Sequence, residues 1–153
     1  MKTVAPFEIG LVVADIDGLL PFYRDLLGLA VIGDIEMAAE RSRASGLAPV
    51  GYRVVRLESR SGDRLKLARP ARSDAVSATT ADYAMHRVGA AYVTWIVDDL
   101  AALHAKLLKA AANIRSQGIV QLRAGLRLLL VADPEGNFLE FLQYDDIKSY
   151  RAP

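Results

Sequence analysis

Two halves of the chain carry the same succession of strand-like and helix-like patterns. β-branched and aliphatic residues dominate residues 8–16 and again residues 92–100, as is typical of strands. Both runs end in acidic residues that can cap a following helix, Asp15 or Asp17 in the first half and Asp98 or Asp99 in the second. The pattern therefore predicts helices over residues 19–27, with Pro21 in the first turn, and over about 100–112.

A second pair of matching segments closes each half. Residues 62–67 align with residues 136–141 as a glycine turn that leads into a strand, and strand-like runs precede them at 52–59 and 126–132. The sequence Asp-Pro-Glu-Gly-Asn at 133–137 is typical of a tight turn between antiparallel strands. The order of strand, helix, strand, polar insertion and two strands thus occurs twice, and an internal repeat of this kind decides the fold.

The repeat predicts an α+β fold in which two tandem modules form one curved mixed sheet around a cup, with helices on its outer face. Neither half can bury the apolar face of its strands well alone. We expect an N-terminal module at residues 1–70, a linker at 71–90, a C-terminal module at 91–144 and a tail at 145–153. The polar insertion at 34–49 has room for a short helix, and two unrelated α+β pieces remain the alternative.

Composition narrows the classes of function. The chain has 153 residues, a formal net charge of +1 and no cysteine, so we expect neither a nucleic-acid partner nor thiolate chemistry. Pro6, Glu8 and Asp15 interrupt the first apolar stretch, which makes it a poor secretion signal. No apolar run approaches the ~18 residues of a membrane helix. We therefore expect a cytoplasmic protein without a membrane partner.

Three stretches together carry a resemblance to a known family. They are residues 7–29 (FEIGLVVADIDGLLPFYRDLLGL), 92–112 (YVTWIVDDLAALHAKLLKAAA) and 128–143 (LLLVADPEGNFLEFLQ). In this combination the chain resembles the vicinal-oxygen-chelate superfamily, which includes glyoxalase I, bleomycin-resistance proteins, methylmalonyl-CoA epimerase and extradiol dioxygenases. The resemblance implies two βαβββ modules, a cup that commonly holds a divalent metal, and a homodimer.

The resemblance also implies a site, because the family's metal ligands come from the first and last strand of each module. The corresponding positions here are Glu8, Lys66, Tyr92 and Glu140. Strand alternation places all four on the cup side. A charged lysine has no lone pair for a metal. We therefore expect a metal-free cluster in which Lys66 is the internal cation between Glu8 and Glu140, with Tyr92 donating a hydrogen bond. The alternative is a weak metal site that uses Glu8, Glu140 and water.

Several other residues are candidates for contacts with a ligand. Those expected to face the cup are Arg56, Glu58, Thr94 and Phe138. For Arg56 and Glu58, a solvated face is the alternative reading. His86 lies in the linker, where it either overhangs the cup or is solvated, and His104 lies within the second helix. Extradiol cleavage needs two histidines at strand positions, so we do not expect it.

Two functions remain open, and both involve a small molecule in the cup. In the first, favoured reading, Glu140 or Glu8 moves a proton next to a carbonyl while Lys66, Tyr92 or Arg56 stabilises the oxyanion. Such an enzyme would be of the glyoxalase, epimerase or lyase type, with no cofactor or with a divalent metal. In the second, the chain sequesters a ligand as bleomycin-resistance proteins do.

Overall fold

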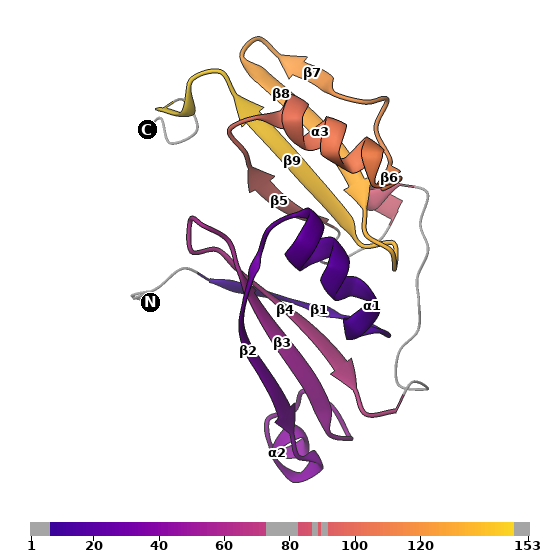
Figure 1. The fold of residues 1–153 in the computed structure, drawn as a ribbon. Coiled ribbons are helices and arrows are strands. Elements are labelled where there is room, and N and C mark those ends of the chain that lie inside the picture. Colours follow the sequence, from indigo (N-terminus) through magenta and orange to yellow (C-terminus); the bar gives the residue numbers. More distant parts are fainter. Residues whose placement is uncertain (1–6, 73–82, 87–88, 90–91, 149–153) are drawn as a thin grey trace. The chain divides into compact units, whose positions relative to one another are not determined.

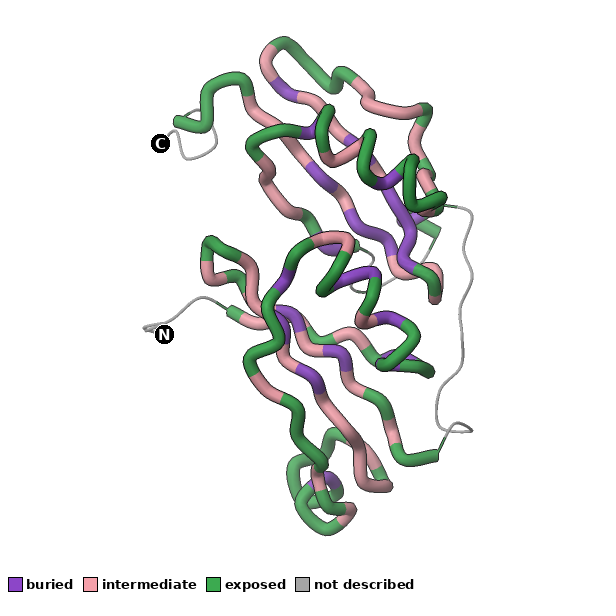
Figure 2. Tube along the Cα trace, in the orientation of Figure 1, coloured by how far each residue is buried: buried purple, intermediate pink, exposed green. Residues whose placement is uncertain are grey.

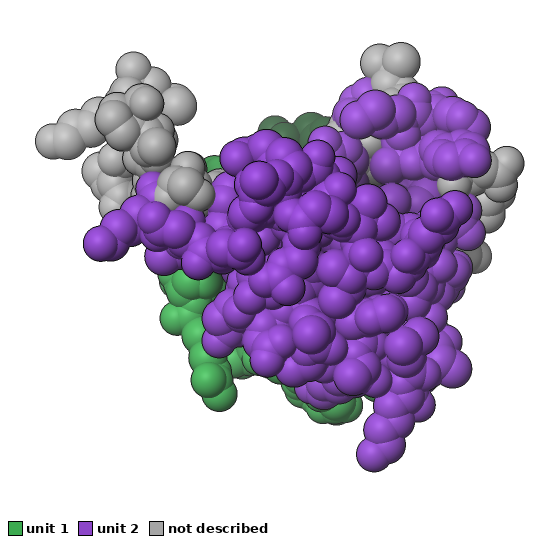
Figure 3. Space-filling model, turned by 90° about the horizontal axis from the view of Figure 1, so that it is seen from above, with its two compact units in different colours: residues 1–78 green, residues 79–153 purple. Residues whose placement is uncertain are grey.

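The computed structural model describes residues 7–72, 83–86, 89 and 92–148 (Figure 1). The chain divides into two compact units, residues 1–78 and residues 79–153 (Figure 3). The division falls within the predicted linker at 71–90, most of which lies outside the described residues, as does the end of the predicted tail.

The first unit consists of a four-stranded sheet and short helices. Its elements are β1 (Glu8–Val12), α1 (Ile16–Leu20), η1 (Pro21–Leu26), β2 (Ala30–Met37), α2 (Ala39–Ala44), β3 (Tyr52–Glu58) and β4 (Arg64–Pro70). The strand order is β1-β4-β3-β2, with β1 parallel to β4 and the other pairs antiparallel (Figure 1). The parallel pair is possible because α1, η1 and the rest of the chain between β1 and β4 form the crossover.

The second unit repeats this arrangement with one strand divided. Its elements are η3 (Ala84–His86), β5 (Tyr92–Ile96), α3 (Leu100–Lys109), β6 (Asn113–Ile114), β7 (Val120–Arg123), β8 (Leu126–Ala132) and β9 (Phe138–Tyr144). The strand order is β5-β9-β8-β6, and β7 also pairs with β8. Because β9 pairs along the whole of β8, β6 and β7 share the other side of β8 and together take the place that β2 has in the first unit.

The α+β class and the tandem repeat predicted from the sequence are confirmed. Within the described residues the strands form two sheets, one for each unit, and the joining of these sheets around a common cup stays a prediction. The insertion at 34–49 does contain a short helix, α2. The first residues of this insertion, as far as Met37, belong to β2.

The predicted bounds of both helices were wrong. The first helix begins at Ile16 because the Asp15 side chain accepts a hydrogen bond from the Gly18 amide at 3.1 Å. Pro21 therefore lies after the first turn, where it has no N–H to donate, and the chain continues from Pro21 to Leu26 as a π-helix. The second helix has the predicted Asp99 cap but ends at Lys109 rather than near 112, before Ala111 with its positive φ of 52°.

Each sheet buries one face beneath its helices. In the first unit α1 packs on β4, and the fully buried side chains of its helices and of β3 and β4 are Val55, Leu57, Leu65, Leu67, Ile16, Leu19 and Tyr23. In the second unit α3 packs on β8 and β9, and Leu100, Leu107, Leu129 and Leu139 are fully buried. Buried and less buried residues alternate along β3, β4 and β9, as Figure 2 shows. The opposite face of each sheet is thus left free for polar side chains.

Among the described residues, no helix has the length and apolar character needed to cross a membrane.

Candidate functional site

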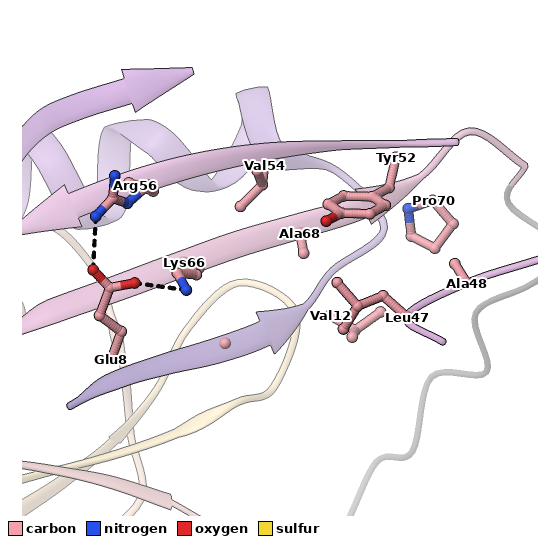
Figure 4. Close-up of a pocket in the computed structure, with 11 residues that line it drawn as sticks. Glu8, Val12, Leu47, Ala48, Tyr52, Val54, Arg56, Lys66, Ala68 and Pro70 are labelled. Atoms are coloured by element: carbon pink, nitrogen blue, oxygen red, sulfur yellow. Dashed lines mark hydrogen bonds and ion pairs between the residues drawn. The ribbon is translucent and has the colours of Figure 1, made fainter. Parts of the chain in front are cut away.

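A cavity of about 610 Å³ lies on the face of the first sheet that α1 does not cover. Strand alternation builds it: Leu65 and Leu67 are buried in the core, so Lys66 and Ala68 between them face the cavity. The loop after α2 closes one side with Leu47 and Ala48 (Figure 4). All of its lining residues belong to the first unit.

The polar end of this cavity is organised around Glu8. Its Oε2 lies 2.6 Å from Lys66 Nζ, and its Oε1 accepts a hydrogen bond from Arg56 Nη2 at 2.7 Å (Figure 4). Arg64 Nη1 is 3.3 Å from the same Oε1, while Arg64 Nε donates to Glu58 at 2.6 Å. These five side chains, Glu8, Arg56, Glu58, Arg64 and Lys66, are called the Glu8 cluster below.

Strand register explains why these charges meet. Arg56 on β3 lies opposite Lys66 on β4, and Glu58 lies opposite Arg64. On the other side of β4, Glu8 of β1 pairs with Arg64, and Gly10, two residues further along β1, pairs with Lys66. Opposite charges on neighbouring strands stabilise a sheet when their side chains share one face.

The cluster holds Glu8 ionised. Hydrogen bonds from Lys66 first, then from Arg56 and Arg64, lower the pKa of Glu8 to about 2. With a side chain only 19% exposed, Glu8 is less accessible than the three cations around it. Both of its oxygens already accept hydrogen bonds, so Glu8 is a weak base at neutral pH.

Positive charge and hydrogen-bond donors are in excess at this end of the cavity. Three cations surround two carboxylates, and among the described residues the Glu58 carboxylate forms an ion pair with Arg64 alone. Arg56 Nε is buried and has no acceptor within the described parts of the chain. Lysine and arginine donate but cannot accept. The site can therefore bind a hydrogen-bond acceptor or an anion.

The same residues do not suit a divalent metal. A metal ligand needs a free lone pair, which the ammonium of Lys66 in its ion pair with Glu8 does not have. A dication at Glu8 would also lie beside Arg56 and Arg64, whose charges repel it. Within the described ranges, no three side chains of histidine, aspartate or glutamate are grouped so as to hold a metal ion.

A second cavity, of about 430 Å³, lies in the second unit. Glu140 and Tyr92 line it from the sheet, and the short helix η3 contributes His86, whose ring lies 5.0 Å from that of Tyr83. Thr94 donates a hydrogen bond to Glu140 Oε2 at 2.7 Å. Sequence reasoning left open whether His86 overhangs the cup or is solvated, and its position shortly before β5 was the available signal.

The structure brings together only some of the predicted site residues. Lys66 pairs with Glu8 as expected, and both Arg56 and Glu58 belong to the cluster rather than to a freely solvated face. The meeting of Lys66 with Glu140 and Tyr92 stays a prediction, because those two residues lie in the other unit. Sequence reasoning missed Arg64. The available signal was its position two residues before Lys66 on β4, since alternation places both side chains on the same face of the strand.

Phe138 does not line either cavity. It is only 5% exposed, and the guanidinium of Arg115 lies 5.7 Å from the centre of its ring. Its expected contact with a ligand therefore stays a prediction without support from this geometry. His104 lies within α3, as predicted.

A family model matches most of the chain. Residues 5–141 match the profile of the Glyoxalase/Bleomycin resistance protein/Dioxygenase superfamily. Among proteins with curated functions, none matches the sequence at a significant level.

Solved structures of similar fold include a glyoxalase family protein from Bacillus cereus, at 20% identity and a TM-score of 0.78, covering 94% of this chain and 96% of that one. A glyoxylase/bleomycin resistance protein/dioxygenase domain from Frankia sp. has 17% identity and a TM-score of 0.69, covering 94% and 93%. A virulence protein from Salmonella typhimurium has 16% identity and a TM-score of 0.56, covering 94% and 98%. At these identities the likeness shows the fold alone.

Proposed function

We propose, from the premise that this chain belongs to the Glyoxalase/Bleomycin resistance protein/Dioxygenase superfamily, that it binds a small organic molecule in the cavity of the first unit without a metal at Glu8. The observation that carries this proposal is the placement of Lys66, Arg56 and Arg64 around Glu8. The ammonium of Lys66 and the guanidinium groups of the two arginines lie around the Glu8 carboxylate, where a metal bound to Glu8 would have to lie. This binding role corresponds to the sequestering alternative that the sequence left open.

The contacts of Glu8 favour an electrostatic role over the role of a general base. A general base works best when its pKa lies near the operating pH, so that it is both ionised and basic. The pKa of Glu8, at about 2, is far below neutrality because Lys66 and the two arginines stabilise its anion. Glu8 therefore positions the cations at the end of the cavity and does not readily take a proton from a substrate.

Metal retention is the first test of this proposal. Purified protein is incubated with manganese, iron, nickel or zinc, desalted and analysed by plasma mass spectrometry. We expect less than about one tenth of an equivalent per chain, because the Lys66 ammonium lies 2.6 Å from the Glu8 carboxylate and offers a metal no lone pair. The proposal of a metal-free site is overturned if the protein retains one equivalent of metal, if Glu8→Ala releases it, and if the matched surface variant Glu36→Ala retains it.

A catalytic function of the lyase or isomerase type is the second candidate. The observation that favours it is Glu140, which lines the cavity of the second unit next to Tyr92 and His86. Only one Glu140 oxygen accepts the Thr94 hydrogen bond, so within the described residues the other is available to a proton. Solvent deuterium incorporated next to the carbonyl of an α-ketoaldehyde or thioester would support an enzyme. Saturable binding without exchange would support the binding role alone.

The homodimer implied by the resemblance also stays a proposal. The mass of the particle in solution, from light scattering on a size-exclusion column, would test it.

A further inference from the structure

We infer that the molecule bound in the cavity of the first unit is an amphipathic organic anion, with an apolar body and one acidic group that binds Arg56 and Lys66. The inference rests on the proposed binding function and names the chemical class of its ligand. It follows from three features of the cavity: its unmatched charge, its unmatched donors and its separation into a charged and an apolar end.

Charge is the first feature. Among the described residues that line the cavity, Arg56 and Lys66 are cations and Glu8 is the only anion. Arg64 also contacts Glu8, but it has Glu58 as its own counter-ion at 2.6 Å. The charged end of the cavity therefore carries an excess of one positive charge. A monoanion neutralises it, whereas a cationic ligand would meet repulsion from two sides.

Hydrogen-bond donors are the second feature. The guanidinium of Arg56 has five N–H groups and the ammonium of Lys66 has three, yet among the described residues each donates to one side chain only, the carboxylate of Glu8. A carboxylate, sulfonate or phosphate provides only acceptors, and charge-assisted hydrogen bonds of this kind are the strong ones.

The shape of the cavity is the third feature. Figure 4 shows Glu8, Arg56 and Lys66 at one end, and Tyr52, Pro70 and Leu47 toward the other. Val12, Val54 and Ala68 line the stretch between them. Gly10 adds to the space, since a Cβ built there would meet no atom within 4 Å. A volume of about 610 Å³ is that of a typical small-molecule site, which suits a ring or branched chain with one acidic end.

Glu8 gives this site its organisation. It binds Lys66 at 2.6 Å and Arg56 at 2.7 Å, so both cations are held side by side before a ligand arrives. Side chains that are already ordered lose less conformational entropy on binding. Glu8 thus orients the two donors that recognise the acidic group, and it is a positioning residue in this role.

Two fluorescent probes with the same apolar body test the inference on the full chain. 8-Anilinonaphthalene-1-sulfonate is an anion, and N-phenyl-1-naphthylamine is its uncharged counterpart. We expect Lys66→Gln and Arg56→Gln each to weaken binding of the anionic probe about tenfold, since each removes a charge-assisted hydrogen bond. The uncharged probe should change by less than about twofold. Lys66→Arg should restore the anionic affinity, and the surface variant Lys109→Gln should alter neither.

A filling variant separates this inference from the proposed function. Ala68→Trp, or Gly10→Phe, places a large ring in the apolar part of the cavity and should weaken both probes. If it does so while Lys66→Gln and Arg56→Gln leave the anionic probe unchanged, the ligand is not recognised as an anion and only the further inference fails. If neither filling variant affects either probe, the cavity is not a binding site and the proposed function fails as well. Circular dichroism of each variant establishes that it is folded.

Discussion

Replacing Asp133 by alanine is expected to lower the free energy of unfolding by about 3 kcal/mol, since it removes a buried ionic acceptor from several donors. Asp133 is 2% exposed. Its Oδ1 accepts from the amides of Glu135 at 2.9 Å and Asn137 at 2.8 Å, and its Oδ2 accepts from Asn137 Nδ2 at 2.8 Å. These bonds shape the turn that leads β8 into β9, so their loss would also loosen the strand that carries Glu140.

Urea unfolding followed by Trp95 fluorescence measures this effect. Trp95 is the only tryptophan of the chain and stacks on Phe141 in the same sheet, so it reports on the second unit. The matched control is Asp98→Ala, because Asp98 is exposed and its side chain makes no hydrogen bond to the described residues. This variant should change stability by no more than about 0.5 kcal/mol. Equal effects of the two variants would show that the Asp133 bonds do not stabilise the turn.

The second large effect is a loss of stability in acid that depends on Glu8. Lys66, Arg56 and Arg64 lower the pKa of Glu8 from 4.5 to about 2, so the folded chain holds this anion more readily than the unfolded chain does. A carboxyl whose pKa is lower in the folded chain than in the unfolded chain contributes its full stabilisation at any pH above its unfolded pKa. This contribution disappears as the pH falls through the folded pKa. We expect Glu8→Gln to lower stability at pH 7 by about 2 kcal/mol, allowing for the solvent exposure of the cations.

The pH dependence distinguishes this mechanism from a simple loss of packing. The difference between the wild type and Glu8→Gln should shrink below about pH 4.5 and vanish near pH 2, where Glu8 itself becomes protonated. Urea unfolding by far-UV circular dichroism measures it, with Trp95 fluorescence recorded in parallel to isolate the second unit. Glu36→Gln, at an exposed position of β2, is the control. A difference that stays constant from pH 7 to pH 2 would refute the role of Glu8 as a stabilising anion.

The sequence by itself determined the repeat and the face on which the candidate site lies. Both rest on local chemistry. Asp99 caps α3 because its side chain reaches the amide of Ala102, three residues on. Lys66 faces away from the core because Leu65 and Leu67 beside it are buried, and a strand alternates with period two. Rules of this kind need only neighbours along the chain.

Tertiary structure alone decided which charges meet. Glu8 and Arg64 are far apart in sequence, and they touch because β1 pairs with β4 in one particular register. A shift of one residue would turn Glu8 to the opposite face, and the choice among registers that keep it on this face depends on pairing between strands distant in sequence. Alternation therefore predicted that Lys66 faces the cavity, whereas the pairing of three strands decided that Arg56 and Arg64 join it around Glu8.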